Sequence, residues 1–489
     1  MRERRIALVC VLTPVLCTAI VVLAAADRPS VLSATTTAHY FPHWMAGPLG
    51  GLLPWLTRDA TVLRYLFTGS LALMYASYAL GLRFLPRAPA AWTIAAIVAV
   101  QALLFLSPPL ALTDIFNYVN YARMEVFHHL NPYTTTPILE PHDDPAFALS
   151  NWHQLLSPYG PLFTLITFAV VPLGLAGSFW ALKAILAAAS LTMILLVWRC
   201  ARLLGRDPVA AIVLVGLNPI VIMWGLGGDH NDFITMMLVV LSFYCLLRGG
   251  ALESLTAASQ PLGREPRRAA ALKLAAGAAL MTAVALKASA GVLVPVVLAP
   301  ALASWRSRGA SGERGRPDDL LLILSGLALG ALVWGVSSIL AFGPHLPDLA
   351  TQGRLVTMYS VPNLLGLALL QGGETEWLRI ALSGALLAAI AWCAVWAYRR
   401  RESLTPAGWA TVALLVTLSW ALPWYILWLL PLAALAGSRR LRTTALVLGV
   451  YFILAWAPVS GGILHALHIH PERTALGKLH QRYVKELLY

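Results

Sequence analysis

Long apolar stretches dominate the chain, and short polar stretches rich in arginine, proline or glycine separate them. A helix that crosses a lipid bilayer needs about 20 consecutive, mostly apolar residues. Measured against that length, the sequence predicts about 13 such helices. They lie near residues 6–26, 62–82, 90–110, 179–198, 208–226, 233–247, 270–286, 288–304, 319–340, 377–398, 406–422, 424–437 and 443–463.

One further apolar segment, residues 161–176, is short and is interrupted by Pro172. The positive-inside rule decides how to place it, because Lys and Arg gather in cytoplasmic loops. If the segment stays on the outer surface, most of the 35 Lys and Arg residues fall on the cytoplasmic side, and the opposite choice reverses the balance. We therefore expect an interfacial or re-entrant element at 161–176 and a cytoplasmic N-terminus.

The composition excludes a soluble cytosolic enzyme. Of the 489 residues, 59% are hydrophobic and only 12% are charged, against roughly 25% charged in a soluble domain. The formal charge of +13 marks orientation in the membrane and does not by itself indicate a nucleic-acid surface. The five cysteines show no metal-ligand spacing. The sequence thus predicts an all-α, multi-pass protein of the plasma (inner) membrane.

In this topology the polar chemistry faces outward, since all twelve histidines fall on the extracytoplasmic side. The outer loop 111–178 carries the clearest pattern. Asp114, Asn117, Tyr118, Tyr121 and Glu125 recur with helical spacing, and apolar residues occupy the opposite face. We expect a helix that lies along the membrane surface and presents Asp114 to an aqueous cavity. The alternative is an ordinary amphipathic connector, but a carboxylate at the exit of an apolar span is costly unless it is used.

Other outward-facing residues are candidates for substrate contacts. Asn131, Tyr133, Trp152 and Tyr159 lie in a loop whose shape is fixed by proline and glycine, and aromatic rings there suit stacking on sugars. Residues of an interfacial aromatic belt are an equally common explanation. Tyr359, in the outer segment 351–363, is a further expected substrate contact.

A compact polar turn follows Gly227 and Gly228 and contains Asp229, His230, Asn231 and Asp232. We expect His230, Asn231 and Asp232 to bind substrate by hydrogen bonds. A metal site or a solvated turn are the alternatives, because two Asp and one His in a single turn are weak evidence for metal ligation.

Three cations, Arg123, Lys287 and Arg354, are placed on the outer side and are expected to hold a lipid phosphate. An Arg side chain forms a bidentate fork for phosphate, and Lys acts as a point charge.

These residues resemble the GT-C superfamily of membrane glycosyltransferases, which use polyprenyl-phosphate sugars, and most of all the actinobacterial α-1,6-mannosyltransferases of lipomannan and lipoarabinomannan synthesis. The matching pieces, in order, are the Asp114 helix with Tyr118 and Tyr121, the Asn131-Pro132-Tyr133 motif, the segment 157–163, the segment 228–232, and Lys287-Ala288. The chain departs from the family pattern where Asp114 follows the third span instead of the first, and where Ala122-Arg123 replaces Gly-Arg.

The resemblance implies that Asp114 is the catalytic base. It also implies a module at 90–304, after extra N-terminal helices in 1–89, and followed by C-terminal helices in 305–463. We expect a basic extracytoplasmic tail at 464–489.

The residues themselves also favour a lipid-linked donor over a sugar nucleotide, because the sequence has no glycine-rich phosphate loop after a strand and no large cytoplasmic domain. A sugar that the enzyme takes up on the outer side is then expected to arrive attached to a lipid. The expected reaction is direct displacement with inversion, in which Asp114 takes the proton of the acceptor hydroxyl and a cation stabilises the departing phosphate.

The expected partners are a polyprenyl-phosphate sugar, a glycan or glycolipid acceptor and the bilayer, with no nucleic acid. No cofactor is expected, with Mg²⁺ or Mn²⁺ as the alternative. Two other functions stay open: a related transferase for arabinose or another sugar, and a lipid-linked sugar transporter or flippase. Transporters tend to show internal repeats and ionisable residues near the bilayer midplane.

Overall fold

The computed structural model describes residues 2–26, 32, 42–52, 59–110, 113–252, 266–311, 318–468 and 478. These residues form helices joined by turns and loops, and no strand occurs among them. The predicted all-α, polytopic class is confirmed. Most of the tail expected at 464–489 lies outside the described residues.

Eight helical stretches of the described chain are long and apolar enough to cross a membrane. They are α1 (Arg2–Ala26), α3 with η2 (Ala60–Arg87), α7 with α8 (Pro161–Leu203), α10 (Asp232–Gly249), α11 (Pro266–Leu286), η6 with α12 (Ala288–Ser307), α13 (Asp319–Phe342) and α16 (Glu376–Arg400).

The count of 13 predicted spans is not confirmed, because five of the apolar runs form shorter or broken helices. Three of these runs form α4 (Ala90–Phe105), α17 (Leu404–Thr417) and the pair η7 (Pro423–Trp428) and α18 (Leu430–Leu435). The run 208–226 splits into α9 (Pro208–Gly216) and the π-helix η5 (Val221–Leu226), with Pro219 between them. The run 443–463 forms α19 (Arg439–Trp456) and α20 (Ser460–Ala466). An apolar run in the sequence therefore overstates the length of continuous helix.

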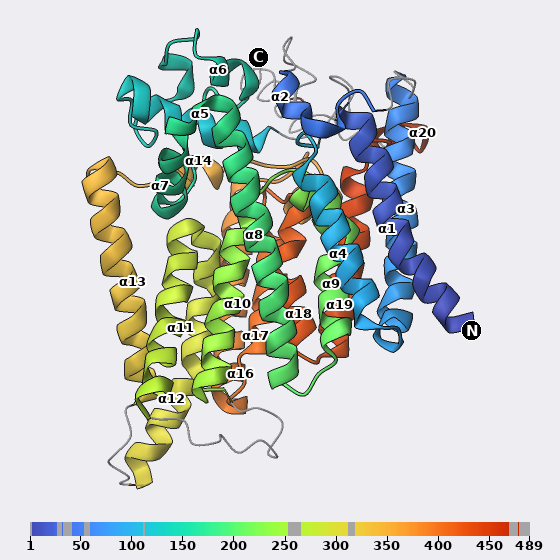
Figure 1. Ribbon diagram of the computed structural model, residues 1–489. Helices are drawn as coiled ribbons and strands as arrows, with labels where there is room; N and C mark the ends of the chain where they lie inside the picture. The colour runs from blue at the N-terminus through green and yellow to red at the C-terminus, as the bar shows by residue number, and fades with distance from the viewer. Residues whose placement is uncertain are drawn as a thin grey trace.

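Most long helices run side by side along the molecule, and the short helices of the outer loop gather at one end (Figure 1). That end carries α5 (Asp114–His128), α6 (Pro145–Leu149), α7 (Pro161–Val170) and α14 (Leu349–Gln352). The N-terminus and the C-terminal ends of α3 and α8 lie at the opposite end.

The segment 161–176 does not form a continuous helix. Its 10-residue helix α7 would be only about 15 Å long, too short to span, and it ends in the 3-10 turn η4 (Val171–Leu173). Gly174, at φ 75°, begins α8 (Gly174–Leu203). The expected short element is thus present, beside α5 at the end of the molecule shown uppermost (Figure 1).

Glycine allows two close helix contacts. A Cβ atom at Gly160, at the start of α7, would lie 2.0 Å from the carbonyl oxygen of Ala285 in α11. Between α11 and α13, a Cβ at Gly277 would lie 2.1 Å from the oxygen of Ile323. Small residues permit such approach in membrane proteins, where helix association depends on packing.

Three six-residue stretches of the described chain depart from α-helical geometry. They are the π-helix η5, the 3-10 helix η6 (Ala288–Leu293) and the 3-10 helix η7. Non-helical backbone at membrane depth is tolerated where it is buried in protein or lines a cavity that water can enter. The site described next borders η6 and η7.

Candidate active site

A cavity of about 830 Å³ opens between the outer loop and the C-terminal helices. Its walls come from the start of α5, the loop before α7, the turn at 230–232, the α11–η6 junction, the segment 349–359 and the segment 418–428. Residues from both halves of the sequence therefore face one space.

Asp114 is the first residue of α5 and lines this cavity. Removal from bulk water raises the pKa of the Asp114 carboxyl to about 7, and the positive charge of Lys287 partly opposes this rise. The nearby negative charge of Asp232 adds to it, and hydrogen bonding from Tyr159 lowers it. A carboxyl with a pKa near neutrality suits a general base, because both protonation states are accessible at working pH.

Lys287 is held at the α11–η6 junction by an ion pair, with 2.7 Å between its Nζ and Oδ1 of Asp232. The same oxygen accepts a hydrogen bond from the indole Nε1 of Trp428. The ammonium also lies 4.8 Å from the ring centre of Tyr425 and 5.0 Å from that of Trp428. Both residues border the cavity, and the Lys287 side chain is 24% exposed whereas that of Asp232 is 1% exposed.

His230 stacks on Trp424 with a centroid distance of 3.6 Å. Burial lowers the pKa of His230 well below its usual value, and the charge of Lys287 lowers it further, so the ring is neutral at physiological pH. The backbone N–H of Asn231 donates to the hydroxyl of Tyr118 at 3.5 Å, and Tyr118 packs edge-on against Tyr159 at 4.8 Å. These contacts join the 227–232 turn to α5.

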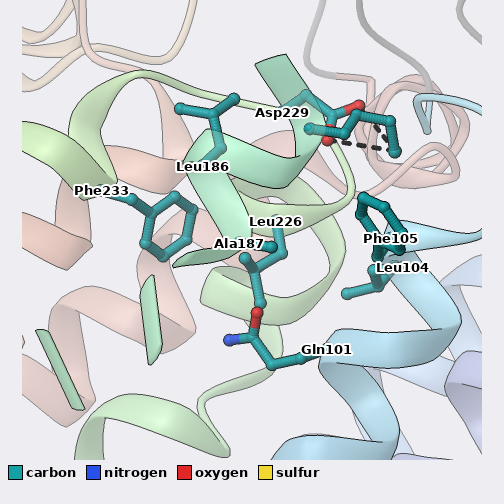
Figure 2. A pocket seen from close by; sticks show the side chains of 9 residues that line it. Gln101, Leu104, Phe105, Leu186, Ala187, Leu226, Asp229 and Phe233 are labelled. Atoms are coloured by element: carbon teal, nitrogen blue, oxygen red, sulfur yellow. Dashed lines mark hydrogen bonds and ion pairs between the residues drawn. The ribbon is translucent and has the colours of Figure 1, made fainter. Parts of the chain in front are cut away.

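A buried ion pair lies behind the same turn. The ammonium of Lys183, in α8, is 3.0 Å from Oδ2 of Asp229, and the two side chains are 1% and 6% exposed. Asp229 faces a small pocket beside Phe105 and Phe233 (Figure 2). The backbone of Asp229 is left-handed, at φ 55°. Sequence analysis missed this pair, although a lysine inside an apolar run is itself a signal for a functional or paired charge.

The α5 helix starts at the predicted position, but the expectation that it lies on the surface is wrong. Both of its faces are covered, since the apolar Ile115 and Val119 and the polar Asn117 and Asn120 are all buried. The two amides bond to the outer loop, Asn117 to Asn151 and Asn120 to Glu140. The sequence analysis was correct that the polar face of α5 has a role, but it was wrong to expect that face to be exposed to water.

Most of the expected substrate contacts do line the cavity. They are Tyr118, Trp152, Tyr159, His230, Asn231, Asp232 and Tyr359, together with Asp114 and the expected phosphate ligand Lys287.

Two expected substrate contacts form hydrogen bonds to backbone carbonyls of the protein instead. The Nδ2 of Asn131 donates to the carbonyl of Phe342 at 2.8 Å. The hydroxyl of Tyr133 donates to the carbonyl of Tyr159 at 2.8 Å. Neither residue lines the cavity among the described residues. Tyr133 holds the backbone of Tyr159, and Asn131 ties the loop to the end of α13.

Two expected phosphate ligands are not brought to the cavity either. Arg123 forms an ion pair with Asp144, at 2.9 Å from Nε to Oδ1, and lies over the ring of Phe127. Arg354 is exposed, although its neighbours on both sides line the cavity. Of the three predicted cations, Lys287 alone borders the cavity in the described part of the chain.

The C-terminal helices supply aromatic residues that sequence analysis did not select. They are Trp420, Trp424, Tyr425, Trp428 and Trp456. The signal was the density of aromatic residues around Pro423, in a segment that the sequence predicted as plain membrane helices.

Within the described ranges, no three His, Cys, Asp or Glu side chains come together as ligands for a metal ion.

Two family models match the chain. The model of the alpha-(1->6)-mannopyranosyltransferase N-terminal domain matches residues 16–303, and that of the MptB C-terminal domain matches residues 357–472. The chain is 27% identical over 430 residues to alpha-(1->6)-mannopyranosyltransferase A of Mycobacterium tuberculosis, which covers 82% of this chain and 77% of the relative.

A probable alpha-(1->6)-mannopyranosyltransferase of Mycolicibacterium smegmatis is 27% identical over 421 residues, which covers 78% of this chain and 71% of the relative. No solved structure matches the chain significantly. Among the functions left open by the sequence, these matches favour an enzyme over a transporter and mannose over arabinose. The first family model spans more than half of the chain, which therefore belongs to the alpha-(1->6)-mannopyranosyltransferase family, as a membrane-embedded mannosyltransferase of GT-C type.

Proposed function

We propose that this mannosyltransferase takes mannose from a polyprenyl-phosphate donor and transfers it to a glycan or glycolipid acceptor on the extracytoplasmic face of the plasma membrane. The observation that carries the proposal is the shared cavity of Asp114 and Lys287. A base whose pKa is about 7 and a cation held by Asp232 are the two groups that the displacement needs.

In the proposed reaction the acceptor hydroxyl attacks the anomeric carbon of the donor mannose. Asp114 takes the hydroxyl proton as the new C–O bond forms, and the bond between the anomeric carbon and the phosphate oxygen breaks. The electron pair leaves with the lipid phosphate, whose charge Lys287 stabilises. Displacement inverts the anomeric centre, so a β-linked donor gives an α-linked product.

The balance of charge in the cavity supports a lipid monophosphate over a sugar nucleotide. Lys287 is the sole Lys or Arg among the described lining residues, and it already neutralises Asp232. Much of the remaining wall is apolar, including Leu355, Met358 and Leu422. One cation beside an apolar wall suits a single phosphate attached to an isoprenoid chain better than a diphosphate attached to a base and ribose.

The distribution of arginine supports the proposed orientation. The last turns of α3, α8, α10 and α16 carry Arg83, Arg202, Arg248 and the pair Arg399 and Arg400, respectively. The ends of α3 and α8 lie far from α5 (Figure 1). By the positive-inside rule that end is cytoplasmic, which leaves the cavity on the outer side.

The test is transfer of labelled mannose from polyprenyl-phosphate mannose to an alkyl mannoside, in membranes that contain the Asp114→Asn variant. We expect a loss of at least about 100-fold, the scale of a positioned general base. Glu140→Gln is the matched control, because burial also raises the pKa of Glu140 to about 7 but the residue lies outside the cavity lining. Full activity of Asp114→Asn would remove Asp114 as the base.

We further propose that the reaction needs no metal ion, with Lys287 providing the positive charge at the leaving group. A chelator titration in the same assay is expected to leave the rate unchanged. Loss of transfer that Mn²⁺ or Mg²⁺ restores would overturn this part of the proposal.

A further inference from the structure

Two tryptophans from distant parts of the chain meet at the cavity. Trp152 lies in the loop before α7, and Trp420 lies between α17 and η7. Their ring centres are 5.8 Å apart with an interplanar angle of 72°. Both side chains are partly exposed and both line the cavity, while Leu155 and Leu355 form a small apolar cluster behind them.

Trp152 is tied to the helix that carries Asp114. The side-chain oxygen of Asn117 accepts hydrogen bonds from the backbone N–H of Asn151 at 2.9 Å and of Trp152 at 3.3 Å. The hydroxyl of Tyr121 donates to the carbonyl of Leu155 at 2.7 Å. Asn117 follows Asp114 by three residues and Tyr121 follows it by seven, which is about 4.5 and 10.5 Å along a helix axis. The loop thus runs beside the first two turns of α5, away from the reacting carboxyl.

Trp420 is tied on both sides in the C-terminal half. The carbonyl of Ser419 accepts from the backbone N–H of Thr357 at 2.9 Å, and the hydroxyl of Thr357 accepts from the N–H of Ala421 at 3.2 Å. The hydroxyl of Ser419 donates to Glu374 at 2.6 Å, and Glu374 is buried. A buried carboxylate is thus used to fix a loop that carries a partly exposed indole. The loop that carries Trp420 therefore has little conformational freedom left to lose when a ligand binds.

The pair suits a neutral sugar. Pyranose rings present C–H groups on their faces, and these pack on the flat apolar surface of an indole. No cation among the described residues contacts either ring, so a phosphate has no partner here and is expected at Lys287 instead. A glycan whose terminal hydroxyl reaches Asp114 must extend away from that residue, and the Trp152 loop lies beside the next two turns of α5.

We propose that Trp152 and Trp420 form a binding subsite for the second sugar of the acceptor glycan, counted from the reacting end. This inference rests on the proposed function, since the position of the reacting hydroxyl is defined by Asp114. It assigns to the two halves of the chain a joint role in selecting acceptors of at least two sugars.

The test compares two acceptors, an alkyl α-mannoside and the corresponding alkyl α-1,6-mannobioside. For the wild-type enzyme we expect kcat/KM to be about tenfold higher with the disaccharide. In Trp152→Ala and in Trp420→Ala this preference is lost, because kcat/KM for the disaccharide falls about tenfold more than kcat/KM for the monosaccharide. Trp152→Phe retains part of the preference because a smaller ring still stacks. Trp305→Ala, at an exposed residue of α12, is the control that keeps the full preference.

Equal losses on both acceptors in the two alanine variants, or a wild type without disaccharide preference, would overturn the subsite. Calorimetric titration of the purified protein with each acceptor, without donor, tests the subsite independently of transfer. Failure of the proposed function has a different signature, because the wild type would then transfer no mannose from the lipid donor even to the monosaccharide. Variants that elute as aggregates are replaced by Trp152→Phe and Trp420→Phe, for which a partial loss of preference is required.

Discussion

The buried pair of Lys183 and Asp229 offers the sharpest test of how the 227–232 turn is held. Lys183→Met removes the cation and keeps a side chain of similar length. Asp229→Asn removes the anion and keeps a residue type that tolerates the left-handed backbone at φ 55°. The double variant Lys183→Met with Asp229→Asn removes both charges. Together these variants form a double-mutant cycle.

The magnitude follows from the environment of the pair. With 3.0 Å between Nζ and Oδ2 and side chains 1% and 6% exposed, each charge depends on the other for compensation. Removing one partner of a buried pair typically costs about 3–5 kcal/mol, because the remaining charge is left alone. Removing both is nearly neutral in many proteins. Each single variant is thus expected to be less stable than the double variant.

The five free cysteines provide the assay. All are buried in the folded protein and become reactive on unfolding. A maleimide dye that fluoresces on reaction with a thiol then reports the thermal midpoint in detergent. We expect the midpoint of the double variant to lie between the wild type and both single variants. A double variant whose loss equals the sum of the two single losses would refute the reasoning, since the two charges would then act independently.

Three further predictions concern the site and the packing. Because only ionised Asp114 accepts a proton, and burial raises the pKa of its carboxyl to about 7, kcat/KM is expected to fall tenfold per pH unit below about pH 7; a profile flat to pH 5 contradicts this. Lys287→Met removes a charge-assisted contact to the departing phosphate worth about 1.5–3 kcal/mol, so kcat/KM for the lipid donor falls by roughly 10- to 150-fold while the acceptor KM changes little. Gly277→Ala, whose Cβ would lie 2.1 Å from the Ile323 carbonyl oxygen, is expected to lower the thermal midpoint of unfolding, whereas Gly335→Ala on the open face of α13 is not. Equal midpoints for the two variants would show that α11 and α13 can move apart without loss of stability.

Local patterns predicted part of this site. The helical spacing after Thr113 identified α5 and its first residue Asp114, because a helix face depends only on residues three and four apart. The break between the predicted helices 270–286 and 288–304 likewise identified the α11–η6 junction at Lys287. Both features are encoded within a few neighbouring residues.

Contacts between distant segments were not predictable in the same way. Arg123 has the charge expected of a phosphate ligand, and its partner Asp144 lies in a different part of the loop, which spacing along α5 does not reveal. The segment that contains Trp424 and Trp428 is apolar enough to be interpreted as membrane helix. Its 3-10 geometry, which brings Trp424 to His230 and Trp428 to Asp232, depends on packing against other helices.

The irregular helices η6 and η7 have a consequence for side reactions. Backbone groups that leave the α-helical pattern at membrane depth are tolerated where they line a space that water enters, and residues of both helices line the 830 Å³ cavity. Water is then a rival nucleophile for the activated mannose. Without acceptor, the enzyme is expected to release free mannose slowly, and a bound acceptor suppresses this leak by displacing the water beside Asp114.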